Sequence, residues 1–127
     1  MKCLIVDDEP FVLRDIHRTA QKVMGEDTEF FLAGNPIEAM KIVEDISSNP
    51  EEILEIAIID IELPYSNGID LAKKIQKIFP RINLIMVSGD GRYALETWEI
   101  NVSDFIIKPV NSNRLQRAVD NLRYPVE

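Results

Sequence analysis

The most constraining feature of this sequence is a fivefold alternation between short apolar runs and longer amphipathic segments. Each apolar run has the length of a buried strand and is bounded by polar residues, glycine or proline. The runs are Cys3–Val6, Phe30–Ala33, the run that ends at Ala57–Ile59, Leu84–Val87 and Phe105–Ile107. Apolar residues recur at helical spacing within 11–24, 37–46, 69–78, about 93–100 and 115–122. This alternation predicts a parallel sheet with helices on both faces.

Size and composition indicate one domain with a substantial core. The chain has 127 residues, of which 46% are apolar, and it shows no repeat or linker, so we expect residues 1–127 to form a single domain. No apolar run approaches the roughly 20 residues of a membrane span, and the N-terminus lacks a secretory-signal pattern. The only cysteine, Cys3, is predicted to be a buried thiol. These features favour a cytoplasmic protein that does not act at a membrane.

The net charge of −8 also limits the classes of partner. An acidic domain repels phosphate backbones, so nucleic acid is not an expected partner of this domain by itself.

Side chains suited to catalysis or binding follow four of the five predicted strands. Asp7 and Asp8 follow the first strand, Asp60 the third, Ser88 the fourth and Lys108 the fifth. The carboxyl ends of parallel strands lie along one edge of the sheet, where ligands bind in such folds. We therefore expect these five residues to form one site.

Each of these residues also has an ordinary structural explanation. Asp60 could cap a strand or make a turn, and Asp7 and Asp8 could be favourable charges at a helix N-terminus. Ser88 could be a turn residue, and Lys108 could be a solvated charge. Their shared position at strand ends favours a common function instead.

Three carboxylates, a hydroxyl and a lysine suit phosphoryl chemistry with a divalent cation. Clustered acids cannot all stay ionised without a cation, and Mg²⁺ prefers oxygen ligands. The sequence has no Cys/His cluster for zinc. A carboxylate beside Mg²⁺ can attack phosphorus and become an aspartyl phosphate, whose charge a lysine and a hydroxyl help to neutralise. Asp60, Lys108 and Ser88 supply these groups.

The same residues give the sequence its resemblance to the receiver domains of two-component response regulators, over essentially the whole chain. The matching segments are Asp7–Pro10, Asp60 with Leu63–Pro64 and Gly68, Ser88–Gly89, and Lys108–Pro109. The resemblance implies a flavodoxin-like α/β fold, which is a doubly wound five-stranded parallel sheet of order 2-1-3-4-5 with five helices.

The resemblance also implies a site and its partners. It implies phosphoryl transfer from a sensor histidine kinase to Asp60, with Lys108 and Ser88 as the other catalytic residues. It implies Mg²⁺ as cofactor, held by Asp7, Asp8, Asp60 and the backbone carbonyl of Glu62, with Asp7 acting largely through water. Such a chain is a phosphoacceptor switch that catalyses only its own phosphorylation and dephosphorylation, not an enzyme acting on other substrates.

Switching and output follow from the same resemblance. Ser88 and Phe105 occupy the positions of the switch residues, and a cis peptide is expected before Pro109. Phosphorylation is expected to alter the face formed by the fourth helix, the fifth strand and the last helix, and this face is a possible homodimer interface.

A narrower likeness concerns the receivers of LytTR-type transcriptional regulators. It is carried by Arg92–Glu96, Asp104–Val110 and Arg114–Leu115. Such receivers precede a DNA-binding domain, which we do not find within residues 1–127, so DNA binding and transcription regulation would need a further C-terminal domain. Asp90 departs from this group, in which an aromatic residue is more usual. Glu62 adds an acid two residues after Asp60, and its side chain is expected to be exposed.

Three other functions are compatible with parts of the pattern. A flavin-binding protein of the same topology needs a phosphate-binding loop after the first strand, but Asp7–Glu9 would repel phosphate. A Mg²⁺-dependent phosphohydrolase would need a general acid or base, for which Glu62 is the only candidate. A receiver used only for docking would be expected to lack some of the five site residues, and none is missing.

Overall fold

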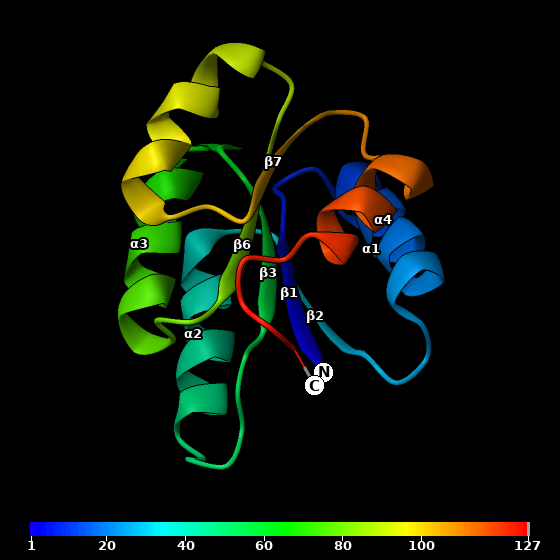
Figure 1. Cartoon of the computed structure of the whole chain (residues 1–127). Helices are drawn as coiled ribbons and strands as arrows, with labels where there is room; N and C mark the ends of the chain where they lie inside the picture. Colours follow the sequence, from blue (N-terminus) through cyan, green and yellow to red (C-terminus); the bar gives the residue numbers. More distant parts are fainter. Residues whose placement is uncertain (127) are drawn as a thin grey trace.

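A parallel sheet of five strands runs through the centre of the molecule in the computed structural model, which describes residues 1–126 (Figure 1). The sheet strands are β1 (Lys2–Val6), β2 (Glu29–Ala33), β3 (Ile56–Asp60), β6 (Asn83–Ser88) and β7 (Asp104–Ile107). Their spatial order is β2-β1-β3-β6-β7, and every neighbouring pair is parallel. This is the predicted order 2-1-3-4-5, so the expected fold class is confirmed.

Helices cover both faces of the sheet. Figure 1 shows α1 (Pro10–Met24) and α4 (Ser112–Asp120) on one face, with α2 (Pro36–Ser47), α3 (Gly68–Ile78) and η1 (Gly91–Ile100) on the other. Local sequence sets several of the helix starts. Pro10 and Pro36 occupy first-turn positions, and the Asn35 side chain accepts a hydrogen bond from the backbone N–H of Glu38.

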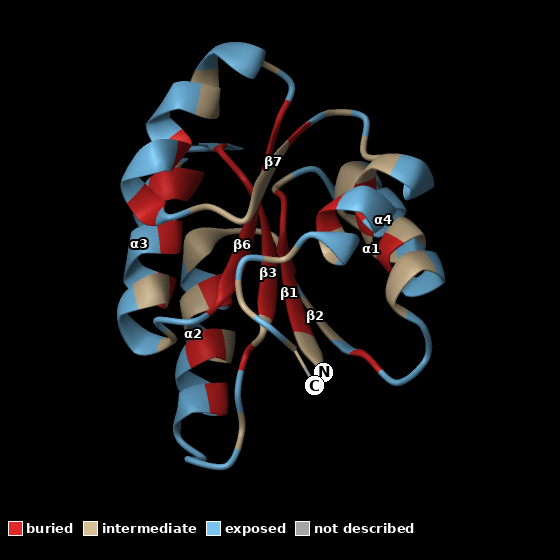
Figure 2. Ribbon diagram, in the orientation of Figure 1, coloured by how far each residue is buried: buried red, intermediate tan, exposed pale blue. Residues whose placement is uncertain are grey.

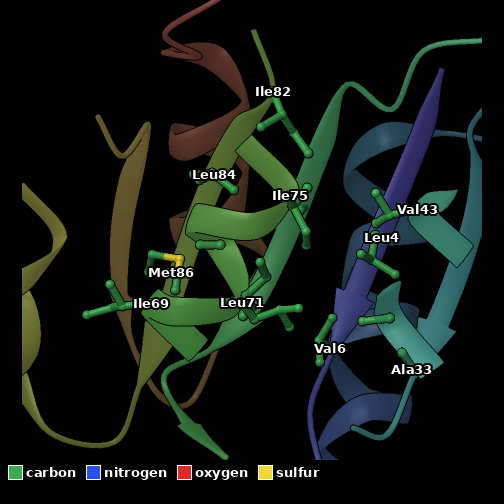
Figure 3. Close-up of a cluster of buried hydrophobic side chains, with 14 of the residues drawn as sticks. Leu4, Val6, Ala33, Val43, Ile69, Leu71, Ile75, Ile82, Leu84 and Met86 are labelled. Carbon is green, nitrogen blue, oxygen red and sulfur yellow. The ribbon is translucent and has the colours of Figure 1, made fainter. Parts of the chain in front are cut away.

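The core consists of two apolar clusters, one on each side of the sheet. Along β1, Leu4 and Val6 pack toward α2 and α3, whereas Cys3 and Ile5 pack toward α1 and α4. Figure 2 shows the buried strands between exposed outer helix faces, and Figure 3 shows the α2/α3-side cluster. Burial on both faces explains why the central strands β1, β3 and β6 are continuous apolar runs rather than alternating ones. Cys3 is fully buried, as predicted.

Two elements differ from the sequence prediction. The fourth helical segment, η1, is a 3₁₀-helix over ten residues, which is unusually long for this helix type. The Thr97 hydroxyl donates to the carbonyl of Ala94 three residues earlier, a contact that suits the tighter winding. The segment predicted as a loop after Asp60 contains a hairpin of β4 (Glu62–Leu63) and β5 (Ser66–Asn67). Its two-residue strands are too short to produce a periodic signal.

The segment around Tyr124 is held at the amino ends of the sheet strands, opposite the predicted site. The buried Asn83 side chain accepts from the Tyr124 backbone N–H at 2.7 Å and donates to the Tyr124 carbonyl at 3.0 Å. Pro125 and Val126, which follow, line the same pocket as Met1 and Lys2, and Figure 1 shows this segment beside the start of β1. None of the helices between residues 1 and 126 combines the length and the apolar character that crossing a bilayer requires.

Candidate functional site

The predicted site residues gather at the carboxyl edge of the sheet. Asp7 follows β1, Asp60 and Ser88 are the last residues of β3 and β6, and Lys108 follows β7. The exposed fractions of Asp7, Asp60 and Ser88 are 0%, 3% and 0%. Burying two carboxylates at the end of apolar strands is unfavourable unless their charges are compensated.

Lys108 supplies that compensation to both aspartates. Its Nζ lies 2.9 Å from Asp7 Oδ2 and 3.1 Å from Asp60 Oδ2. The other oxygen of each aspartate makes a local turn, because Asp7 Oδ1 accepts from the Glu9 N–H at 2.9 Å and Asp60 Oδ1 accepts from the Glu62 N–H at 3.0 Å. A role in shaping local turns therefore explains only the Oδ1 atom of each aspartate, and Oδ2 of each faces Lys108 instead. The peptide bond between Lys108 and Pro109 is cis, as the resemblance implied.

The three acids are arranged like the ligands of a hard cation. Asp7, Asp8 and Asp60 each offer a carboxylate oxygen, and these oxygens lie within 4.8 Å of one another. Asp7 Oδ2 is buried, and within residues 1–126 it has no hydrogen-bond partner of acceptable geometry despite its proximity to Lys108. An all-oxygen donor set with one unsatisfied, buried oxygen fits Mg²⁺.

The electrostatics of the site are those of two acids that share one lysine. Burial raises the pKa of Asp60 to about 6, and the nearby Asp7 charge adds to this, although hydrogen bonds from Lys108 and the Glu62 N–H oppose it. Burial lowers the pKa of Lys108, but the two carboxylates outweigh this and hold it above its ordinary value. A bound divalent cation would favour the ionised form of Asp60.

Gly68 allows α3 to begin directly beneath this site. Its N–H donates to the Ile61 carbonyl at 2.8 Å, and a Cβ at this position would lie 2.0 Å from the Asp60 carbonyl oxygen. Only glycine permits this approach, which explains its position eight residues after Asp60.

The two residues predicted to act as a switch, Ser88 and Phe105, lie on the neighbouring strands β6 and β7. The Lys108 backbone N–H donates to the Ser88 carbonyl at 2.8 Å, which connects the ends of these two strands. Phe105 on β7 is half-buried and packs against the α2/α3-side cluster.

Sequence reasoning missed the role of the Glu62 side chain. Residue 62 is exposed, as predicted, but its carboxylate accepts hydrogen bonds from the Ser88 hydroxyl and the Gly89 N–H. An acid two residues after Asp60 was the only available signal, and it could not identify its partners 26 and 27 residues away.

Comparisons with known proteins identify the family of this chain. The family model for the response regulator receiver domain matches residues 3–120. The sensory transduction protein LytR of Staphylococcus haemolyticus is 31% identical over 127 residues, which cover 99% of this chain and 46% of that protein. The transcriptional regulatory protein LytR of Staphylococcus aureus is 29% identical, covering 97% of this chain and 47% of that protein. The chain thus spans about half the length of these relatives.

Solved structures show the same fold. A response regulator receiver domain protein from Clostridium thermocellum has a TM-score of 0.79 and 25% identity, covering 94% of this chain and 91% of that one. A CheY-like receiver domain protein from Methanospirillum hungatei has a TM-score of 0.74 and 27% identity, covering 94% and 90%. The strand order, the residues at the strand ends and the matched family together show that this chain belongs to the response regulator receiver domain family.

Proposed function

We propose that Asp60 accepts a phosphoryl group from a phosphohistidine of a sensor histidine kinase. The observation that carries this proposal is the placement of Asp60, which is buried at a strand end beside Lys108 and the acids Asp7 and Asp8. An oxygen of the Asp60 carboxylate forms the new bond to phosphorus while the bond from phosphorus to the histidine nitrogen breaks. The leaving imidazole takes up a proton.

The surrounding residues divide the remaining tasks. Lys108 already contacts Asp60 and is placed to neutralise charge on the phosphoryl oxygens. Asp8 and Asp60, the Glu62 backbone carbonyl, and Asp7 through water would hold Mg²⁺, which supplies electrostatic stabilisation of those oxygens when bound. Ser88 is the hydroxyl donor at the end of β6.

The output surface is the face formed by η1, β7 and α4. Leu95 and Trp98 on η1 are 78% and 80% exposed, and Ile107 on β7 is 56% exposed. Exposed apolar groups of this kind are typical of a protein interaction surface. We propose that phosphorylation repacks Ser88 and Phe105, that this face then pairs with a second copy, and that the full-length protein regulates transcription.

The rival functions have less support from the contacts. A phosphohydrolase would need Glu62 as a general acid or base, but one of its carboxylate oxygens, Oε1, already accepts from the Ser88 hydroxyl and the Gly89 N–H. A receiver used only for docking would not need Lys108 within ion-pair distance of two buried carboxylates.

The decisive experiment is labelling by a small phosphodonor with Mg²⁺, read by intact mass and by lability to hydroxylamine. Asp60→Asn should abolish the adduct, whereas Asp70→Asn, on the exposed side of α3, should leave it unchanged. Undiminished labelling of Asp60→Asn would contradict the proposed acceptor.

A further inference from the structure

The Glu62 side chain spans the gap between the end of β3 and the end of β6. Its Oε1 accepts from the Ser88 hydroxyl at 2.5 Å and from the Gly89 N–H at 3.2 Å. The Ser88 oxygen in turn accepts from the Asp90 N–H at 3.0 Å. A hydroxyl has one proton to donate, so the donor capacity of Ser88 is fully used by Glu62.

The backbone of Glu62 is fixed beside Asp60. Its N–H donates to Asp60 Oδ1 at 3.0 Å, and the residue pairs with Asn67 in the β4–β5 hairpin. Its carboxylate therefore reaches the end of β6 from an anchored position.

A phosphoryl group on Asp60 would need the same donors. Like a carboxylate, it is an anion that only accepts hydrogen bonds, and charge-assisted bonds of this kind are short and strong. The single Ser88 proton cannot serve both anions. We propose that Glu62 is an intramolecular competitor that holds Ser88 and Gly89 in the unphosphorylated arrangement; we call this contact the Glu62–Ser88 latch.

The latch regulates the site whose function is proposed above, and it rests on Asp60 being the phosphoryl acceptor. Phosphorylation must release Ser88 from Glu62. The free energy that this release costs makes phosphorylation of Asp60 less favourable, and it weakens the binding of a non-covalent phosphoryl analogue in the same way. The loop after Ser88 leads directly into η1, so opening the latch frees the segment that connects the site to the output face.

A simpler alternative is that Glu62 acts only through its negative charge. Glu62→Asp separates the two explanations, because it keeps the charge and withdraws the carboxylate by the length of one methylene, about 1.5 Å. Glu62→Ala removes both the charge and the contact. The latch predicts that the two variants behave alike, whereas a pure charge effect predicts that Glu62→Asp behaves like wild type.

The first measurement needs no phosphodonor. We expect the Gly89 amide proton to move upfield and to exchange faster with solvent in both variants, because it loses its carboxylate acceptor. Unchanged Gly89 shifts and exchange rates in both variants would overturn the latch, whatever the function of Asp60.

The second measurement is a titration with beryllofluoride at saturating Mg²⁺. Glu62→Asp and Glu62→Ala should each bind about fivefold more tightly than wild type. In a Ser88→Ala background, the gain from Glu62→Asp should fall to about twofold or less, because only the Gly89 contact remains to be released.

Two outcomes separate the latch from the function on which it rests. If Glu62→Asp binds beryllofluoride with the affinity of the wild type while Glu62→Ala binds it more tightly, the latch is overturned and Glu62 acts through its charge alone. Absence of beryllofluoride binding in wild type would contradict the proposed function of Asp60, and the Gly89 amide would still decide whether Glu62 holds this loop.

Discussion

Two buried carboxylates, Asp7 and Asp60, share a single lysine, so the site carries more negative charge than its ion pairs within residues 1–126 neutralise. Asp7 is the less satisfied of the two acids, because its Oδ2 lacks a hydrogen bond of acceptable geometry within residues 1–126. Functional sites commonly retain such destabilising arrangements because a ligand uses them.

The first prediction concerns Asp7. Asp7→Asn should stabilise the cation-free protein by about 1–2 kcal/mol, because Lys108 would then pair with Asp60 alone. The same substitution should remove most of the stabilisation that Mg²⁺ gives to the wild type. Urea unfolding with and without Mg²⁺ measures both effects. Loss of stability in the variant without Mg²⁺ would show that Asp7 strengthens the fold.

At the scale of the elements, the site depends on how closely the start of α3 approaches the end of β3. The approach places the Gly68 backbone against the Asp60 carbonyl, so the position of α3 and the position of Asp60 are coupled.

Gly68→Ala tests this coupling. The added Cβ would meet backbone atoms at 2.0 Å and 2.8 Å, so we expect a loss of about 3 kcal/mol or more and weaker phosphodonor labelling. Gly34→Ala is the matched control, because a Cβ there meets nothing within 4 Å and the residue does not require a positive φ. Equal unfolding free energies for the two variants would contradict the role of Gly68.

The junction of β7 and α4 is held by an ion pair. The Arg114 guanidinium donates to both carboxylate oxygens of Asp104, at 2.9 Å and 2.7 Å, and to the Phe105 carbonyl at 2.8 Å. This pair connects the strand that carries Phe105 to α4, within the proposed output face.

The Asp104–Arg114 pair makes the stability of the fold depend on pH in a definite direction. Burial raises the pKa of Asp104, but hydrogen bonds from Arg114 and the Phe105 N–H outweigh it, so the folded pKa lies below the ordinary 3.8. The stabilisation is therefore fully present above the unfolded pKa and is lost as the pH falls through the folded one. Asp104→Asn should be less stable than wild type at pH 7, and the difference should narrow below about pH 4. The measurement is the free energy of unfolding of both proteins between pH 7 and acid pH. A stability difference that does not change with pH would contradict the pairing of Asp104 with Arg114.

At the scale of the whole molecule, the proposed phosphoryl site lies at the carboxyl ends of the sheet strands, and the segment tethered through Tyr124 lies at their amino ends. In the proposed function, phosphorylation of Asp60 reaches the output face of η1, β7 and α4 through the end of β6 and the loop that leads from it into η1. Trp98, the only tryptophan, is 80% exposed on η1 and reports on that face.

The final prediction is that beryllofluoride with Mg²⁺ changes the fluorescence emission of Trp98. The change should be absent in Asp60→Asn and reduced in Ser88→Ala, because the first lacks the acceptor and the second lacks the switch hydroxyl. Amide shifts confined to the Asp60 loop, with constant Trp98 emission, would show that the site does not communicate with η1.

The sequence by itself determined the layered α/β architecture, since short apolar runs such as Cys3–Val6 that alternate with amphipathic helical segments are typical of a parallel sheet covered on both faces. It also determined which residues stand at the carboxyl edge, because Asp7, Asp60 and Lys108 follow those runs directly. Both conclusions depend on local periodicity and on one general rule of strand topology, so they could be drawn without coordinates.

Only the tertiary structure decided which atoms meet. The sharing of Lys108 by two carboxylates, the contact of Glu62 with Ser88 and the tether between Asn83 and Tyr124 each join segments more than 20 residues apart. The local sequence pattern likewise did not predict the 3₁₀ winding of η1 or the short hairpin after Asp60. Side-chain contacts between distant segments depend on how closely two backbones approach, and this distance is set by the packing of the whole core rather than by any local spacing.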